Sequence, residues 1–365
     1  MAKHIDTLDV QLALHTGVKD IIKGKLYPSS DEEGVYELSP AYLPVAFRYQ
    51  CRGYYLIVKL SHQFMVGIET PEELQEKVIQ LVTDFFGIST DDIIQYQVIK
   101  TPISKLRVKC NSGKEITRIL GGKPVLQDLV EINRIEYCNN TKMLNPDVEK
   151  LIVADIFRIA PETSRGATKG LWKYPNRVNC TYATDNNTHV AITCYFKEYE
   201  RLEDGDLEGA EKYKGCLRSE VKLKNAHLNY MKGSRDKTLR NYFKEDVAQE
   251  YFTKYLAPIF STEPFYRVDV ALDMIENYEP QSDEDIVVTD LEKKRACAFI
   301  IEINQNGISA VKTKHDDKTF KKYISIVRRL GINPICYSEL IDGQVITIEK
   351  MKNFTLFSNS ISEDI

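Results

Sequence analysis

Two segments in the middle of the chain alternate between apolar and polar side chains, and this alternation constrains the fold most strongly. The first segment covers residues 188–197, and its apolar face consists of Val190, Ile192, Cys194 and Phe196. The second covers residues 217–224, and its apolar face consists of Leu217, Val221 and Leu223. Because residues two apart in a strand share one face, both segments are predicted to be strands that pack one face against a core.

Further strands are predicted along the chain, at residues 4–12, 53–60, 93–100, 104–110, 129–137 and 178–183. A helix is predicted after Thr70, which can cap it, with Pro71 at the first helical position and Gly87 at the end. Strands interrupted by single helices indicate an α+β fold, in which helices cover one face of an antiparallel sheet.

The sequence from residue 234 to 260 is helical and aromatic in pattern, and an acidic linker at 279–285 precedes a basic helix predicted at Lys318–Leu330. We therefore expect two domains, with boundaries 1–262 and 263–365. The second is expected to be a small α/β domain that binds DNA or joins two copies of the chain.

Composition narrows the class of protein. Of the 365 residues, 43% are hydrophobic and 28% are charged, which is typical of a globular protein in water. No apolar run approaches the roughly 20 residues of a membrane span, and the N-terminus has no secretory pattern. The eight cysteines form no C-x-x-C pair, so we expect reduced thiols and a cytoplasmic location.

The polar faces of the two alternating segments could carry chemistry. On the first, His189, Tyr195 and Lys197 are expected to share one face, and the alternative is an ordinary solvent-exposed face. On the second, Glu220 lies among cations and is expected to face outward with them. This carboxylate would form surface ion pairs or would bind a metal within a phosphate-binding surface.

Positive charge is concentrated between residues 212 and 244, although the whole chain has a net charge of −4. This segment contains ten Lys and Arg residues but only two acids, Glu220 and Asp236, which gives it a local charge of +8. Four aromatic residues lie among the cations: Tyr213, Tyr230, Tyr242 and Phe243. Cations mixed with aromatics favour nucleic-acid binding, and the alternative is a solvated helix with its aromatics in the core.

Four short motifs, in this order along the chain, resemble those of the replication initiators of filamentous phages and of rolling-circle plasmids. They are Ile5-Asp6-Thr7-Leu8, Arg134-Ile135-Glu136, the run Tyr195-Phe196-Lys197-Glu198-Tyr199-Glu200 with His189 six residues ahead, and Arg218-Ser219-Glu220. The second motif departs from the family pattern, which has Asp where this chain has Glu136. The motifs span residues 5 to about 225.

The resemblance implies a DNA-nicking and ligating domain with a permuted form of the HUH endonuclease fold. It implies that Tyr195 is the nucleophile that forms a 5′-phosphotyrosyl link and frees a 3′-hydroxyl primer, and that Lys197 stabilises the phosphate or leaving group. Glu136, His189 and Glu220 would bind Mg²⁺ or Mn²⁺, and the histidine would favour Mn²⁺.

The partner that the resemblance implies is the replication origin, as single- and double-stranded DNA. We expect eight cations to contact this DNA: Arg134, Arg218, Lys222, Lys224, Lys232, Arg235, Lys237 and Arg240. The resemblance leaves two further partners undecided, a host helicase or polymerase and a second copy of the chain.

Two other functions are compatible with the sequence, a DNA-binding replication or partition factor without catalysis and a mobilisation relaxase. Geometry would separate the first from a nickase, because a nickase needs Glu136, His189 and Glu220 to converge beside Tyr195.

Overall fold

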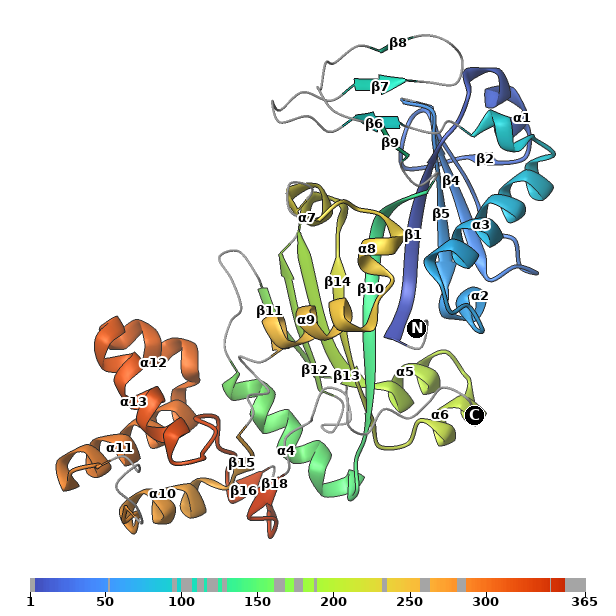
Figure 1. Ribbon diagram of the computed structural model, residues 1–365. Helices are drawn as coiled ribbons and strands as arrows, with labels where there is room; N and C mark the ends of the chain where they lie inside the picture. The colour runs from blue at the N-terminus through green and yellow to red at the C-terminus, as the bar shows by residue number, and fades with distance from the viewer. Residues whose placement is uncertain are drawn as a thin grey trace. The chain divides into compact units, whose positions relative to one another are not determined.

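The computed structural model describes residues 4–51, 53–93, 130–160, 189–231, 235–256, 263–280, 287–341 and 343–351. It gives the backbone alone for six further strands, at 97–99, 107–109, 115–116, 124–126, 168–173 and 180–186. The fold is a mixture of helices with a large antiparallel sheet (Figure 1), which confirms the predicted α+β class.

The contacts within the chain define two compact units. The first consists of residues 1–137, 188–190 and 222–248, and the second of residues 138–187, 191–221 and 249–365. Strands β10 (Glu131–Lys142) and β14 (Cys216–Leu223) run without a break from one unit into the other. The domain boundary expected at residue 262 falls inside the second unit and stays a prediction.

In the first unit, the strands follow the order β10-β1-β5-β4-β3-β2. The bounds are β1 Ile5–Ala13, β2 Tyr27–Pro28, β3 Val35–Leu38, β4 Val45–Gln50 and β5 Tyr55–Ser61. Strand β1 pairs antiparallel with both neighbours, and Leu8 lies opposite Leu60 on one side and Ile135 on the other. These three side chains are buried, so the centre of the sheet also anchors the core.

Helix α3 (Pro71–Phe86) packs on this sheet and begins and ends as predicted. The Thr70 side chain accepts a hydrogen bond from the Glu73 backbone, and Gly87 ends the helix with φ 66°. Its last turn stacks on the sheet, because the Phe85 ring centroid lies 4.6 Å from that of Phe47 on β4. The shorter helices of this unit are α1 Lys19–Gly24, α2 His62–Met65, α7 Asn225–Met231 and α8 Leu239–Tyr242.

In the second unit, the strand order is β11-β12-β13-β14, with bounds β11 Thr168–Lys173, β12 Cys180–Asn186 and β13 Val190–Phe196. Burial alternates strictly along β13, as the two-residue period predicts. The helices near these strands are α4 Pro146–Ile159, α5 Lys197–Glu203, α6 Leu207–Lys212 and α9 Glu245–Leu256. The acidic segment 203–211 contains most of α6, whose N-terminus is capped by the Asp206 side chain.

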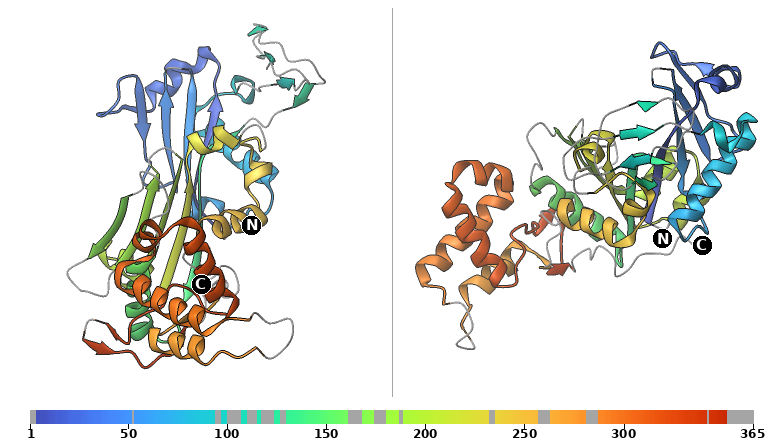
Figure 2. Two further views of the ribbon diagram at one scale, coloured as in Figure 1. Left: turned by 90° about the vertical axis from the view of Figure 1, so that its left-hand side faces the viewer. Right: turned by 45° about the horizontal axis from the view of Figure 1, so that its top comes forward.

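The rest of this unit is mainly helical (Figure 2), with α10 Val268–Glu276, α11 Asp290–Asn306, α12 Ile308–Lys314 and α13 Asp317–Arg329. Two short strand pairs complete it, β15 (Phe265–Tyr266) with β18 (Lys350–Met351) and β16 (Leu340–Ile341) with β17 (Gln344–Val345). Among the described residues, no helix combines the length and apolar character that crossing a bilayer requires. Six cysteines among the described residues form no disulfide bond.

Candidate active site

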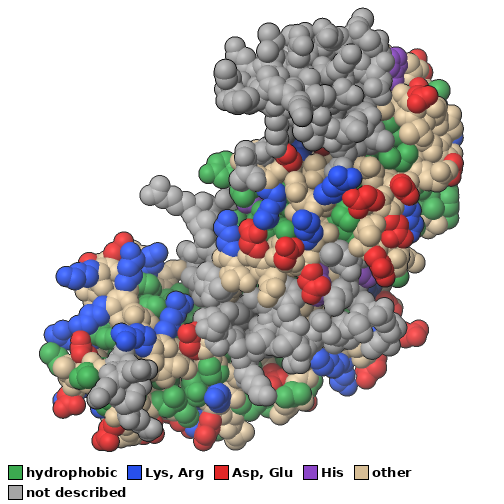
Figure 3. Space-filling view, in the orientation of Figure 1, with side chains coloured by type: hydrophobic (Ala, Val, Ile, Leu, Met, Phe, Trp, Pro, Cys, Tyr) green, Lys and Arg blue, Asp and Glu red, His purple; other side chains and the backbone are tan. Residues whose placement is uncertain are grey.

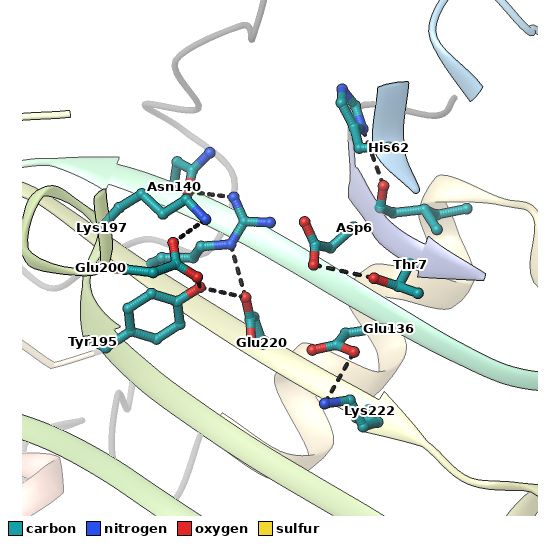
Figure 4. A network of polar contacts seen from close by, with 12 residues as sticks. Asp6, Thr7, His62, Glu136, Asn140, Tyr195, Lys197, Glu200, Glu220 and Lys222 are labelled. Carbon is teal, nitrogen blue, oxygen red and sulfur yellow. Dashed lines mark hydrogen bonds and ion pairs between the residues drawn. The ribbon is translucent and has the colours of Figure 1, made fainter. Parts of the chain in front are cut away.

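Three carboxylates on neighbouring strands converge at one place in the large sheet. Asp6 on β1, Glu136 on β10 and Glu220 on β14 each offer an oxygen, and these three atoms lie within 4.8 Å of one another. We call these three residues the acidic cluster. Figure 4 shows their carboxylates pointing toward one another.

A local irregularity of β1 accounts for the position of Asp6. Thr7 pairs with Glu136, but the register of β1 against β10 shifts between Ile5 and Thr7. Such a shift turns a side chain away from strict alternation, as β-bulges commonly do beside functional sites. Asp6 therefore faces the carboxylates of the next two strands, and it accepts a hydrogen bond of 3.3 Å from the Thr7 hydroxyl.

Two cations balance part of the negative charge of the acidic cluster. The Lys222 ammonium lies 3.0 Å from Glu136 Oε2, and Arg218 Nε donates to Glu220 Oε1 at 2.8 Å. Three carboxylates against two cations leave a net negative charge. A set of hard oxygen ligands with net negative charge fits Mg²⁺ or Mn²⁺ and is less suited to softer metals. The acidic cluster could therefore bind a divalent metal.

The Tyr195 hydroxyl lies beside the acidic cluster. Its oxygen is 2.8 Å from Glu220 Oε1 and 3.2 Å from Glu200 Oε1 (Figure 4). A phenol has one proton to donate, so the two carboxylates compete for it. Glu220 thus contacts both the candidate nucleophile and the candidate metal position.

Burial and negative charge hold the phenol in its neutral form. Burial raises the pKa of Tyr195 far above its usual value, and the charges of Glu220 and Glu200 raise it further. Arg218 opposes these effects only in part. A cation bound to Glu220 would offset the effect of the two carboxylate charges on the pKa of Tyr195, because an opposite charge nearby favours the ionised phenolate.

Lys197 reaches the site from a helix and does not belong to the strand face on which it was expected. Strand β13 ends at Phe196 and α5 begins at Lys197, so the helix sets the direction of this side chain. The ammonium pairs with Glu200 one turn further along the helix. Lys197 is buried, and it lies 5.8 Å from the centroid of the Tyr195 ring.

A buried ion pair fixes the start of α5. Lys150 on α4 pairs with Glu198, and both residues are buried. Glu198 also accepts a hydrogen bond from the Gly215 backbone, just before β14. These contacts hold the first turn of α5, and therefore Lys197 and Glu200, beside Tyr195.

His189 does not belong to the acidic cluster. It lies in a turn just before β13, and its ring centroid is 6.5 Å from that of His227 and 6.3 Å from that of Tyr230. Of the three expected metal ligands, Glu136 and Glu220 come together and the third position is taken by Asp6. The reason for preferring Mn²⁺, which rested on the histidine, therefore falls away. The first motif contains Asp6, but the motif alone does not indicate a role for its side chain.

Most of the expected DNA-binding cations form ion pairs with acids of the chain. Five ion pairs show this: Arg134–Asp9, Arg218–Glu220, Lys222–Glu136, Lys237–Glu131 and Arg240–Glu72. Three of these pairs join a cation of residues 212–244 to an acid outside that segment, which lowers its local charge from +8 to about +5. Lys224 and Arg235 are only partly exposed, and Lys232 lies outside the described residues.

Arg218 departs most from expectation. The charged residues of β14 were expected to face outward, yet every residue of this strand except Lys222 is buried. Arg218 is 2% exposed and Glu220 is 8% exposed. A buried guanidinium requires a charged partner, so this pair is part of the core and not a surface ion pair.

Comparisons with known proteins add little to this description. No protein-family model matches the chain, and no curated protein matches it. One similar solved structure is the TBP of Methanococcus jannaschii, with 10% identity and a TM-score of 0.30 over 70% of this chain and 97% of that one. Another is a rolling circle replication initiator protein from Geobacillus stearothermophilus, with 12% identity and a TM-score of 0.30 over 80% of this chain and 89% of that one. Similarity at this level carries no argument about function.

Proposed function

We propose that this protein is a metal-dependent DNA nickase that initiates rolling-circle replication at an origin. One observation carries the proposal: the Tyr195 hydroxyl lies 2.8 Å from Glu220, whose carboxylate also belongs to the acidic cluster. Glu220 therefore connects the candidate nucleophile to the candidate metal ligands. The four motifs that resemble those of replication initiators include every residue of this arrangement.

In this proposal, the Tyr195 oxygen attacks a backbone phosphorus of one DNA strand. The new bond joins the tyrosine oxygen to phosphorus, and the bond from phosphorus to the 3′-oxygen breaks. The 3′-oxygen takes up a proton from water and becomes the hydroxyl that primes synthesis. The energy of the phosphodiester is kept in the phosphotyrosyl bond, so the same site can later rejoin the strand.

The residues around Tyr195 have separate roles in this step. Glu200 accepts the phenol proton, because Glu220 is held by the buried Arg218 and would also be a metal ligand. Lys197 pairs with Glu200 and brings a positive charge close to the attacked phosphate. Asp6, Glu136 and Glu220 would hold Mg²⁺ or Mn²⁺, which when bound supplies Lewis-acid stabilisation of the phosphate charge.

The test is a cleavage assay with supercoiled, origin-bearing DNA and Mg²⁺ or Mn²⁺. The wild-type protein is expected to form a DNA adduct that survives denaturant. Tyr195→Phe is expected to lower its yield by at least about 1,000-fold, as loss of a nucleophile does elsewhere. DNA binding should persist, because phenylalanine keeps the ring and removes only the oxygen.

Tyr199→Phe is the matched control, since this tyrosine lies four residues further on and its hydroxyl contacts Lys150 at 3.4 Å. It should form the adduct normally. If Tyr195→Phe nicks as well as the wild type, the proposal is wrong.

A second function is favoured by two features of the site: His189 does not converge with Glu136 and Glu220, and the Tyr195 phenol is held in its neutral form. With its pKa raised by burial and by two carboxylates, Tyr195 is a poor nucleophile unless the site is neutralised. In a non-catalytic DNA-binding replication factor on the same fold, Tyr195 would stay protonated permanently. Such a factor would bind origin DNA equally well with and without a divalent metal and would form no adduct under either condition.

A further inference from the structure

Helix α13 presents a continuous basic face that the proposed nicking site does not use. Its cations at 318, 321, 322, 328 and 329 fall within an arc of about 120°, because successive residues are 100° apart around a helix. All five residues are exposed, and Ser325 is at the centre of the arc. Figure 3 shows Lys and Arg side chains gathered over the C-terminal helices.

Most of these cations have no acidic partner among the described residues. Lys322 pairs with Glu292 on α11 at 2.7 Å. In the part of the chain that the structure describes, the other four, Lys318, Lys321, Arg328 and Arg329, form no ion pair. They differ in this respect from the cations near the nicking site, which are largely neutralised.

Three of the five acids of these helices, Glu292, Glu302 and Asp316, are occupied in capping and pairing. Asp316 caps α13 by accepting a hydrogen bond of 2.9 Å from the Thr319 backbone. Glu302 pairs with His315 at 2.8 Å and also with Lys314. From residue 290 to 330 there are ten Lys and Arg against five Asp and Glu, a net charge of +5 in a chain of net −4.

The opposite face of α13 is already packed, which limits the kind of partner. Tyr323 and Val327 are buried, and the Phe299 ring on α11 lies 5.7 Å from that of Tyr323 and 5.6 Å from that of Phe320. A membrane-surface helix needs a free apolar face beside its basic one. α13 has none, so a rigid polyanion fits this surface better than a lipid bilayer does.

The dimensions of the helix agree with a DNA duplex. The 13 residues of α13 extend for about 20 Å, and the major groove, about 12 Å wide, admits one α-helix. A turn of two residues, His315 and Asp316, joins α12 to α13. Two helices joined by a tight turn, the second one basic, are typical of proteins that place a helix in this groove.

We propose that the basic face of α13 binds double-stranded DNA, with Lys318, Lys321, Arg328 and Arg329 on phosphates and Ser325 toward the base edges. This inference rests on the proposed function only for the biological role of duplex binding, since a nickase must hold the duplex that flanks its cleavage site. The surface itself needs neither Tyr195 nor a metal.

The test removes three of these charges in a protein that cannot nick. The test variant combines Lys321→Ala, Arg328→Ala and Arg329→Ala with Tyr195→Phe. Its binding to a 30-base-pair duplex is measured in EDTA across a salt series. Affinity is expected to fall about 10- to 100-fold. The slope of log affinity against log salt should decrease by about two to three, because each lost phosphate contact removes about 0.9.

The control combines Lys59→Ala, Lys254→Ala and Lys350→Ala, three exposed lysines outside α13, so the change in net charge is the same. It should bind as the Tyr195→Phe parent does. Equal affinity and salt slope for the α13 variant and this control would overturn the inference. So would an α13 variant that keeps duplex binding but loses binding to single-stranded DNA or to anionic vesicles. Neither result depends on whether the protein nicks DNA.

Discussion

Arg218→Leu is expected to lower the free energy of unfolding by about 3–5 kcal/mol. Arg218 is 2% exposed, and its Nε donates to Glu220 at 2.8 Å. The substitution leaves Glu220 buried beside Asp6 and Glu136 without its main cationic partner. Chemical denaturation of the metal-free protein followed by circular dichroism measures the change.

Two further variants separate this electrostatic effect from lost packing. Arg218→Leu combined with Glu220→Leu removes both charges and should regain much of the lost stability, because no uncompensated charge then remains buried. Arg201→Leu is a surface control, since Arg201 lies 3.7 Å from Asp206 in a partly exposed pair that should contribute under about 1 kcal/mol. If Arg218→Leu costs no more than Arg201→Leu, the pair does not have the structural role described.

Asp6→Asn is expected to weaken Mn²⁺ binding by about 100-fold or more. Loss of a residue that merely orients a metal ligand typically costs 10- to 100-fold, so loss of one of three ligands should cost at least as much. The wild-type protein should melt at a higher temperature with Mn²⁺ than in EDTA, because a ligand that binds only the folded state stabilises it. The variant should show almost no such increase. Titration calorimetry measures the affinity.

The same variant should not be less stable in EDTA. The three carboxylates of the acidic cluster repel one another without a metal, and asparagine removes one of the charges while keeping the shape. Asp20→Asn, an exposed residue on α1, is the control and should leave Mn²⁺ binding unchanged. Unaltered Mn²⁺ affinity in Asp6→Asn would show that the metal binds elsewhere or not at all.

Local sequence patterns predicted the elements whose conformation depends on near neighbours. The two-residue period located β13 and β14, and the capping signals of Thr70 and Gly87 located both ends of α3. The motifs that resemble those of replication initiators indicate Glu136, Tyr195 and Glu220 as site residues, although Glu136 replaces the Asp of the family pattern. For these features, the deciding interactions lie within a few positions along the chain.

Features that depend on distant partners were missed. Asp6 reaches the acidic cluster only through a register shift against β10, some 130 residues further along the chain, and alternation alone cannot show a shift of one residue. The burial of Arg218 depends on elements that cover both faces of β14. In the same way, Arg240 pairs with Glu72, 168 positions away, so counting charges within residues 212–244 alone overstated the positive surface.

The most direct test of the central claim is to identify the residue that is joined to DNA. The covalent adduct formed on origin DNA with Mg²⁺ or Mn²⁺ would be digested with nuclease and protease, and the nucleotide-bearing peptide sequenced by mass spectrometry. The account predicts a phosphotyrosyl link at Tyr195 alone. A link at Tyr199 or any other residue, or cleaved DNA with no protein attached, would contradict it.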